Sequence, residues 1–323
     1  MQGIPWNLFG PTGVTRPAVT FGNTMDKGSS MRSFLFVPGD SPGKLEKGLK
    51  AGADALILDL EDSIAPDRKV EARTTTLAFL KEVAAATNRP RLLVRVNGLA
   101  TNLTDADLDV VLGGRPDAIM LPKAEGGPSI VHLDAKLSAR EALLGLPDRV
   151  IETVALATET AAALFVAGTY AGASTRLRGL TWGAEDLATE LGAETNRDER
   201  GRLTEPFRLA RTLCLAAAAS ARVQAIDTVY VDFRDGAGLR RDAEQARRDG
   251  FTGKLAIHPS QVAIINEVFT PSKTAIVRAT AIVAAFTAQP AAGVVGIDGV
   301  MYDRPHLEQA KQVLARARAA GLA

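Results

Sequence analysis

Short apolar runs alternate with longer amphipathic stretches along most of the chain, beginning near residue 31. Eight of these runs contain few polar residues, which is typical of strands that are covered on both faces of a parallel sheet. They are residues 32–37, 55–60, 91–96, 118–122, 152–158, 178–182, 227–232 and 254–257. Apolar residues at helical spacing lie between them, so the pattern predicts an α/β protein with eight strand–helix units.

Two architectures accommodate such units. An open, doubly wound sheet usually carries a GxGxxG turn after its first strand, but the corresponding segment here, VPGDSPGK, lacks that spacing. A closed (β/α)8 TIM barrel has no such requirement. We therefore predict a TIM-barrel domain over residues 31–269.

The pattern changes at both ends of the chain. Residues 270–323 contain two amphipathic stretches joined by PAAGVVGIDGVMYD, which predict a small C-terminal helical cap. Residues 1–30 are rich in Gly, Pro and Thr and lack the continuous apolar core of a signal peptide. We expect them to form an irregular N-terminal arm, either packed on a neighbouring molecule or partly disordered.

Charge and composition exclude several classes of protein. The 323 residues include 38 Lys plus Arg and 37 Asp plus Glu, and this balance gives no electrostatic reason to expect a nucleic-acid partner. No apolar run approaches the ~18–20 residues that span a bilayer, so we expect no membrane insertion. The single cysteine, Cys214, lies in an Ala-rich helical pattern and is expected to be buried. These features favour a cytoplasmic protein.

Polar residues follow nearly every predicted strand, where the active site of a TIM barrel lies. They are Asp59, Glu61, Asp62, Arg95, Asn97, Lys123, Glu159, Glu185, Asp186, Asp232 and His258. A structural explanation exists for several of them. Glu185 and Asp186 could be acids in the first turn of a helix, Arg95 could pair with a structural carboxylate, and His258 could belong to a turn.

Taken together, the polar residues also suggest chemistry. Glu159 and Asp186 follow consecutive strands, and two carboxylates completed by water and substrate oxygens suit Mg²⁺. No Cys/His cluster is present for zinc. Arg95 interrupts an apolar strand and needs an anion, which it could grip in fork geometry. The pattern predicts a small oxo- or hydroxy-acid held by a divalent ion, and C–C bond cleavage or formation.

Several segments resemble the HpcH/HpaI aldolase and citrate lyase β-subunit-like family, in the family's order from about residue 31 to 312. They are RSFLFVPGDSPGKLEK, GADALILDLEDSIAPDRKVEAR, LLVRVNG, IMLPKAE, ETAAAL, WGAEDLATELG, AIDTVYVDFRD, GFTGKLAIHPSQVAIINEVFTPS and IDGVMYDRPHLEQA. The resemblance implies a Mg²⁺-dependent TIM barrel that cleaves a 3-hydroxyacyl-CoA thioester, of the malyl-CoA or citramalyl-CoA type. The products would be acetyl-CoA and a 2-oxo acid.

The resemblance also implies roles for individual residues. Glu159 and Asp186 would bind Mg²⁺, and Arg95 would hold the oxo-acid and stabilise the developing alkoxide. Asp303 would transfer the proton at the barrel mouth of an adjacent subunit in a homo-oligomer, and relatives form trimers. The supporting residues would be Asp59, Glu61 and Asp62 around Arg95 or the metal waters, Lys44 and Lys47 near the coenzyme A phosphates, and Ile257 and His258 along the thioester.

The sequence departs from the family pattern at three positions, and other functions than the lyase are also compatible with it. Ala161 and Ala162 stand where family members often have Gly, and Phe36 stands where some relatives have an aromatic hydroxyl. One alternative is a citrate lyase β subunit that acts on a carrier-protein thioester. Others are a malate-synthase-type transferase and thioesterase, or a non-catalytic assembly subunit, which fits poorly with so many intact site residues.

Overall fold

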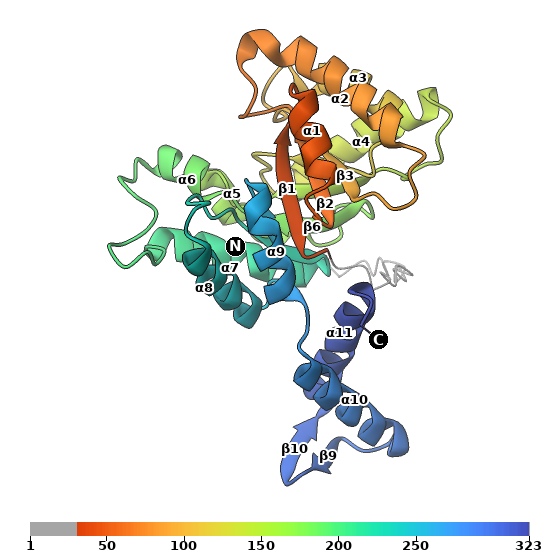
Figure 1. Ribbon diagram of the computed structural model, residues 1–323, viewed down its shortest axis with the longest axis vertical. Helices are drawn as coiled ribbons and strands as arrows, with labels where there is room; N and C mark the ends of the chain where they lie inside the picture. Colours follow the sequence, from red (N-terminus) through yellow and green to blue (C-terminus); the bar gives the residue numbers. More distant parts are fainter. Residues whose placement is uncertain (1–30, 323) are drawn as a thin grey trace, which may run out of the picture.

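The computed structural model describes residues 31–322, and eight parallel strands in this part of the chain close into a barrel (Figure 1). The strands follow the sequence around the barrel, and the first also pairs with the eighth. They are β1 (Ser33–Pro38), β2 (Ala55–Asp59), β3 (Arg91–Arg95), β4 (Ala118–Leu121), β5 (Glu152–Leu156), β6 (Leu177–Thr181), β7 (Gln224–Asp227) and β8 (Gly253–Ala256). The predicted (β/α)8 TIM barrel is confirmed.

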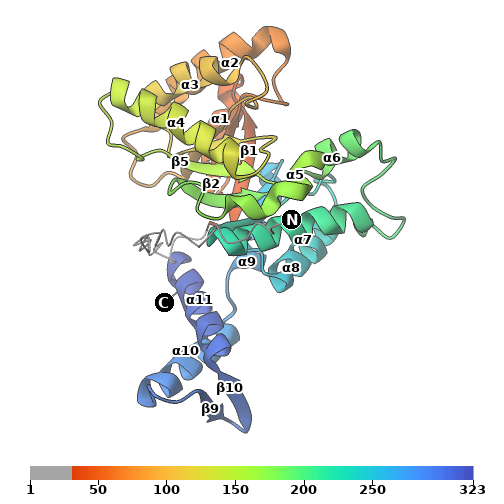
Figure 2. The same cartoon turned by 180° about the vertical axis from the view of Figure 1, so that it is seen from behind.

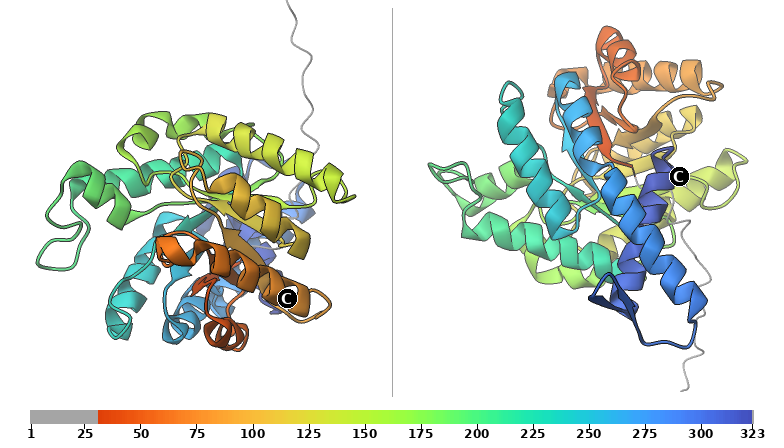
Figure 3. Two further views of the ribbon diagram at one scale, coloured as in Figure 1. Left: turned by 90° about the horizontal axis from the view of Figure 1, so that it is seen from above. Right: turned by 60° about the horizontal axis from the view of Figure 1, so that its bottom comes forward.

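Helices connect the strands and surround them, as Figure 3 shows. The α-helices of the barrel are α1 (Pro42–Leu49), α2 (Lys69–Val83), α3 (Thr104–Val111), α4 (Gly127–Leu143), α5 (Ala161–Val166), α6 (Ala184–Leu191), α7 (Glu205–Ala221), α8 (Gly236–Asp249) and α9 (Pro259–Phe269). Three short 3-10 helices, η1 (Pro66–Arg68), η2 (Leu112–Gly114) and η3 (Ala167–Tyr170), lie between them.

The strands separate two apolar cores, because successive residues of a strand point to opposite faces. The inner core fills the barrel and includes Phe34, Ile57 and Met120. The outer core lies between the strands and the helices, and Trp182 and Phe207 are among its large side chains. Both faces of the strands are therefore buried, which explains why the strand sequences are almost continuously apolar.

The seventh strand differs from the prediction. β7 covers Gln224–Asp227, whereas the sequence pattern indicated 227–232. α7 ends before Arg222, whose left-handed backbone (φ 57°) stops the helix and lets the strand begin early. The β-branched and aromatic residues that follow have high strand propensity but form a loop. The prediction that this strand ends at Asp232 was wrong: Asp227 ends it and is buried, whereas Asp232 is exposed.

The segment after the barrel is not purely helical. It contains α10 (Lys273–Ala288), β9 (Val294–Ile297), β10 (Val300–Asp303) and α11 (Arg304–Ala319), and we call it the C-terminal arm. β9 and β10 form an antiparallel hairpin that the sequence analysis missed. Its two-residue turn is Asp298-Gly299, with φ of 49° and 77°, which matches the left-handed turns that connect short hairpins.

The C-terminal arm has an apolar core of its own, which includes Phe286, Tyr302 and Leu307, and its two helices pack side by side (Figure 3). α9 runs antiparallel to β8 and returns the chain to the amino-terminal end of the strands. The arm leaves from there and projects away from the barrel (Figures 1 and 2). It therefore does not cover the mouth of its own barrel.

Two expectations from the sequence concern other parts of the chain. The predicted N-terminal arm, residues 1–30, lies outside the described residues. Among residues 31–322, no helix is both long enough and apolar enough to cross a membrane.

Candidate active site

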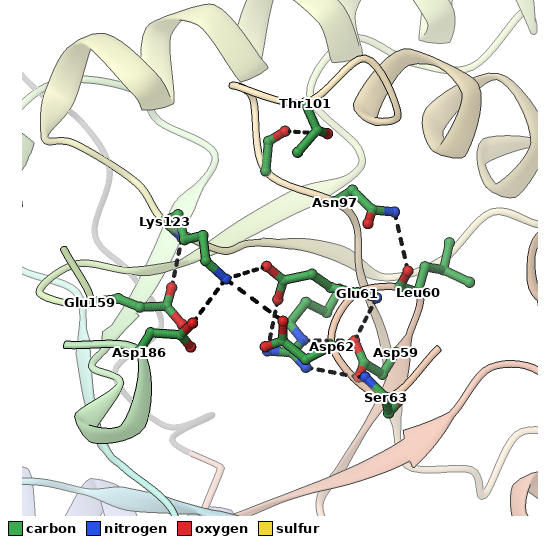
Figure 4. A network of polar contacts seen from close by, with 12 residues as sticks. Asp59, Leu60, Glu61, Asp62, Ser63, Asn97, Thr101, Lys123, Glu159 and Asp186 are labelled. Atoms are coloured by element: carbon green, nitrogen blue, oxygen red, sulfur yellow. Dashed lines mark hydrogen bonds and ion pairs between the residues drawn. The ribbon is translucent and has the colours of Figure 1, made fainter. Parts of the chain in front are cut away.

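Charged and polar side chains from five neighbouring strands gather at the carboxyl end of the barrel (Figure 4). We call this set the mouth cluster. Its members are Asp59, Glu61 and Asp62 at the end of β2, Arg95 and Asn97 at the end of β3, Lys123 after β4, Glu159 after β5 and Asp186 in the first turn of α6. The sequence prediction named all of them as strand-end residues.

The carboxylates of Glu159 and Asp186 lie next to each other (Figure 4). Glu159 is 1% exposed and Asp186 is partly exposed, with 35% of its side-chain surface accessible. Burial and the hydrogen bond to Asp186 raise the pKa of Glu159 well above its ordinary value. Burial also opposes ionisation of Asp186, but the hydrogen bond from Glu159 and the charge of Lys123 lower its pKa. The two adjacent carboxyl groups therefore titrate together, with the proton favoured on Glu159 and the negative charge favoured on Asp186.

The backbone around this pair has two special positions. Gly183 precedes α6, and a Cβ there would lie 3.0 Å from Glu159 Oε1, so a larger residue would displace the carboxylate. Lys123 adopts a left-handed backbone (φ 49°), which is uncommon for a residue other than glycine. In this conformation its backbone N–H donates to Glu159 Oε2 at 2.7 Å. Strain at such positions is typical of functional sites.

The side chain of Lys123 joins the two halves of the mouth cluster (Figure 4). Its Nζ lies 2.6 Å from Glu61 Oε1, 3.2 Å from Asp186 Oδ1 and 3.7 Å from Asp62 Oδ1. Burial opposes its charge, but the carboxylates of Glu61, Glu159 and Asp62 raise the pKa of Lys123. The sequence analysis placed Lys123 at a strand end without giving it a role. Its left-handed backbone, which is rare for lysine, sets the direction of the side chain, and residue type alone does not reveal that conformation.

Arg95 is held mainly by Asp59. Its Nε donates to Asp59 Oδ1 at 2.7 Å and its Nη2 donates to Oδ2 at 2.8 Å, which is the fork geometry of a strong arginine–carboxylate pair. The guanidinium also lies over the ring of Phe36, 4.8 Å from its centroid. Burial would raise the pKa of Asp59, but Arg95 lowers it below the ordinary value. The structural pair with Asp59 therefore engages two of the three guanidinium nitrogens of Arg95, Nε and Nη2.

The third nitrogen, Nη1, points toward the remaining acids. It donates to Asp62 Oδ2 at 3.2 Å and lies 2.9 Å from Glu61 Oε2, in an ion pair that lacks hydrogen-bond alignment. Burial raises the pKa of Glu61 to about 7, although Arg95 and Lys123 both favour the carboxylate. A negatively charged ligand at the mouth would therefore meet Arg95 through Nη1.

Glu159 and Asp186 could together hold a hard divalent cation. Their adjacent carboxylates offer the hard oxygen ligands that such an ion prefers. Residues 31–322 contain no group of three or more His, Cys, Asp or Glu side chains arranged around one ion. A cation held by these two residues would thus complete its shell with water and ligand oxygens, which is the habit of Mg²⁺.

Four other predicted site residues lie outside the mouth cluster. Lys44 and Lys47 are exposed on α1, which follows β1. Ile257 is 40% exposed after β8, and His258 is the N-cap residue of α9, where its Nδ1 accepts a hydrogen bond from Ser260 N at 3.2 Å. The backbone N–H groups of Ile257 and His258 both donate to Gln261 Oε1, at 2.8 and 3.3 Å. Neither of these two backbone N–H groups is thus free to bind a ligand.

Asp303 lies on the C-terminal arm, at the end of β10 and the start of α11. Its side chain is 46% exposed, and its Oδ1 lies 2.5 Å from His306 Nδ1. The hydrogen bond from His306 lowers the pKa of Asp303. The sequence analysis assigned no hydrogen-bond partner to Asp303. The signal was available in the spacing, because residue N3 of a helix commonly bonds back to its N-cap residue.

Comparisons with known proteins identify the family of the chain. The profile of the HpcH/HpaI aldolase/citrate lyase family matches residues 32–259, which include the whole mouth cluster. The chain belongs to this family. It is an enzyme of the lyase class, as the sequence resemblance implied.

Individual relatives cover nearly the whole chain. A (3S)-malyl-CoA thioesterase of Cereibacter sphaeroides is 40% identical over 290 residues, which are 89% of this chain and 95% of the relative. The mitochondrial citramalyl-CoA lyase of Rattus norvegicus is 34% identical over 300 residues, 88% of this chain and 86% of that protein. The crystal structure of Mycobacterium tuberculosis CitE in complex with magnesium, acetoacetate and coenzyme A has a TM-score of 0.72 at 30% identity. It covers 90% of this chain and 99% of that protein.

Proposed function

We propose that the protein is a Mg²⁺-dependent carbon–carbon lyase that cleaves a 3-hydroxyacyl-CoA thioester, of the malyl-CoA or citramalyl-CoA type, into acetyl-CoA and a 2-oxo acid. The observation that carries the proposal is the adjoining pair of carboxylates, Glu159 and Asp186, with Arg95 Nη1 and Lys123 Nζ in the same mouth cluster. The names of its relatives, which include malyl-CoA and citramalyl-CoA lyases, support this substrate class.

Each group of site residues would have a different role in the cleavage. Glu159 and Asp186 would bind Mg²⁺, which supplies Lewis-acid stabilisation of the negative oxygen that develops at C3. Arg95 would present Nη1 to the same end of the substrate, held in place by its fork to Asp59. Asp62, the most exposed acid around Arg95, would help to orient it. Lys44 and Lys47 on α1 would meet the phosphates of coenzyme A, and the Ile257–His258 segment would line the thioester.

The bond changes balance without a further reactant. The 3-hydroxyl group loses its proton to solvent, the C2–C3 bond breaks, and the electron pair of that bond passes to C2, which becomes part of the thioester enolate. Asp303, after taking up a proton from solvent, delivers it to C2, and acetyl-CoA and the 2-oxo acid leave. Condensation is the reverse process, in which Asp303 acts as the base.

This scheme requires more than one copy of the chain. Asp303 lies on an arm that leaves the amino-terminal end of the strands, whereas the mouth cluster lies at their carboxyl end (Figures 1 and 2). We propose that Asp303 serves the mouth of an adjacent subunit in a homo-oligomer, such as the trimer that the family resemblance suggests. The exposed side chains of Val300 and Met301, beside Asp303 on the hairpin, provide an apolar surface for that contact.

A second candidate activity is hydrolysis of the thioester. Four of the curated relatives, at 37 to 40% identity, are named (3S)-malyl-CoA thioesterases. In that reaction water would attack the thioester carbonyl, and coenzyme A and malate would leave. A third candidate, a citrate lyase β subunit acting on a carrier-protein thioester, is favoured by structural likeness to a subunit of that name.

Product analysis separates these activities. The purified protein is incubated with Mg²⁺ and malyl-CoA, and separately with citramalyl-CoA. Acetyl-CoA together with glyoxylate or pyruvate is the expected outcome. Free coenzyme A with malate would instead show a thioesterase, and turnover only with an acylated carrier protein would show a citrate lyase subunit. No product from any of these substrates, in the presence of Mg²⁺, would refute the proposed function.

A further inference from the structure

A buried hydroxyl group near the mouth cluster has no hydrogen-bond partner. Thr181 is the last residue of β6 and has no exposed surface, and none of the described residues offers its Oγ1 a hydrogen bond. A hydroxyl taken out of water without a partner lowers stability. Such groups are rare in native proteins and generally face a water molecule or a ligand. The hydroxyl of Thr181 therefore needs a hydrogen-bond partner that the described residues do not provide.

Strand alternation places Thr181 inside the barrel. A Cβ at Gly179 would contact Val154 and Ile226, both members of the inner core. Thr181 lies two residues further along β6 and so points to the same side. Its neighbour in the register is Leu156, another residue of the inner core. The hydroxyl thus lies at the upper end of the barrel interior and not among the surrounding helices.

The same strand leads directly to the carboxylate pair. Two residues after Thr181, the backbone of Gly183 lies against the side chain of Glu159, and α6 then carries Asp186. Thr181 is therefore the inward-facing position immediately below the turn that touches the proposed metal site. It is an uncharged donor below a turn that leads to two acidic side chains, Glu159 and Asp186.

We propose that Thr181 Oγ1 donates a hydrogen bond to an oxygen of the 2-oxo acid held at the mouth cluster, and so helps to position that half of the substrate. This assignment rests on the proposed lyase function. An oxo-acid oxygen satisfies the unpartnered hydroxyl, and a neutral donor binds an anionic ligand without competing with the metal for Glu159 and Asp186. Thr181 is a specificity residue because it selects a ligand with an oxygen at this point over one with a methyl group.

The test uses Thr181→Val, which keeps the shape of the side chain and removes the hydroxyl. We expect pyruvate to bind the Mg²⁺-loaded variant about tenfold more weakly, the loss that corresponds to one hydrogen bond. Titration calorimetry measures this affinity. The unfolding temperature of the free variant should equal or exceed that of the wild type, because a buried hydroxyl without a partner has been removed.

The matched control is Thr76→Val. Thr76 is equally buried, but its Oγ1 donates to Gly39 O at 3.2 Å. This variant should unfold at a lower temperature and bind pyruvate as the wild type does. Opposite changes of the two variants in unfolding temperature and in pyruvate affinity distinguish a hydroxyl that binds a ligand from one that stabilises the fold.

Three results would overturn the assignment. They are wild-type affinity of Thr181→Val for pyruvate, an equal loss of affinity for Mg²⁺ titrated alone, and a lower unfolding temperature with unchanged pyruvate binding, which would indicate a structural water. Failure of the proposed function itself gives a different result, because wild-type protein would then release no acetyl-CoA with a 2-oxo acid from any of the thioesters tested.

Discussion

Lys123 Nζ lies 3.2 Å from Asp186 Oδ1, so one of the two carboxylates proposed to bind Mg²⁺ already pairs with a cation of the chain. Two unit charges at about 4 Å interact by roughly 4 kcal/mol near a protein surface, so Lys123 opposes a metal ion at Asp186. We expect Lys123→Met to increase the affinity for Mg²⁺ by about tenfold or more. Titration calorimetry measures this change.

The same substitution should destabilise the metal-free protein, because Glu61 and Asp186 lose their shared partner. Thermal unfolding in a chelator checks this expectation. Lys123→Arg is the matched control, since it keeps the charge and the same left-handed backbone position. Weaker Mg²⁺ binding by Lys123→Met would contradict the prediction, because the ammonium group would then be supporting the metal site.

Two adjacent acids at the start of α6 should differ sharply in function. Asp186 adjoins Glu159, whereas Glu185 accepts a hydrogen bond from Asn196 at 2.8 Å on the exposed side of the helix. We expect Asp186→Ala to abolish Mg²⁺-dependent turnover while the protein stays folded, and Glu185→Ala to retain turnover close to the wild type. Circular dichroism and steady-state kinetics check the pair, and normal turnover by Asp186→Ala would refute the metal assignment.

The barrel and most of the mouth cluster were predictable from sequence for one geometric reason. The carboxyl ends of parallel strands meet at one mouth, so Glu159 and Asp186 at the ends of consecutive strands had to lie close together. Partners within the cluster were not predictable to the same extent. Asp59 and Asp62 were both candidates to pair with Arg95, and in the folded protein Asp59 forms the two-bond fork with its guanidinium.

Features that depend on local backbone conformation escaped the sequence analysis. β7 was placed too late because left-handed Arg222, which ends α7, has no signature in residue type. The hairpin of the C-terminal arm was missed although Asp298-Gly299 is a typical hairpin turn. The unpartnered hydroxyl of Thr181 is visible only once every neighbour has been placed.

Mixing two inactive variants should restore activity if Asp303 serves a neighbouring subunit. Asp186→Ala disables the mouth of its own barrel, and Asp303→Ala disables the arm that serves another. In a symmetric ring formed from equal amounts of both, about a quarter of the sites combine an intact mouth with an intact arm. We therefore expect about a quarter of wild-type turnover after the variants are unfolded and refolded together.

A second mixture controls for this experiment. Glu159→Ala and Asp186→Ala both alter the same mouth, so no exchange of subunits can assemble a complete site from them. We expect this mixture to stay inactive. If Asp186→Ala and Asp303→Ala also fail to complement each other, although the refolded protein contains mixed oligomers, Asp303 does not act on an adjacent subunit.

The buried ion cluster behind β7 and β8 should make stability depend on pH. Asp227 is 1% exposed, and its carboxylate pairs with Lys254 at 2.9 Å and Arg211 at 3.0 Å. Burial opposes its charge, but these two cations lower its pKa from 3.8 to about 2. Because the folded pKa lies below the unfolded one, Asp227 stabilises the fold above about pH 4, and this contribution is lost as the pH falls toward 2.

Asp227→Asn removes this dependence. We expect the difference in unfolding free energy between the wild type and Asp227→Asn to shrink by about 2 kcal/mol as the pH falls from about 5 to about 2. Urea unfolding across that range measures it. Asp232→Asn alters the exposed loop residue that the sequence had placed at the end of the strand, and it should follow the wild type. A constant difference for Asp227→Asn would mean that the carboxylate does not gain its stability from Lys254 and Arg211.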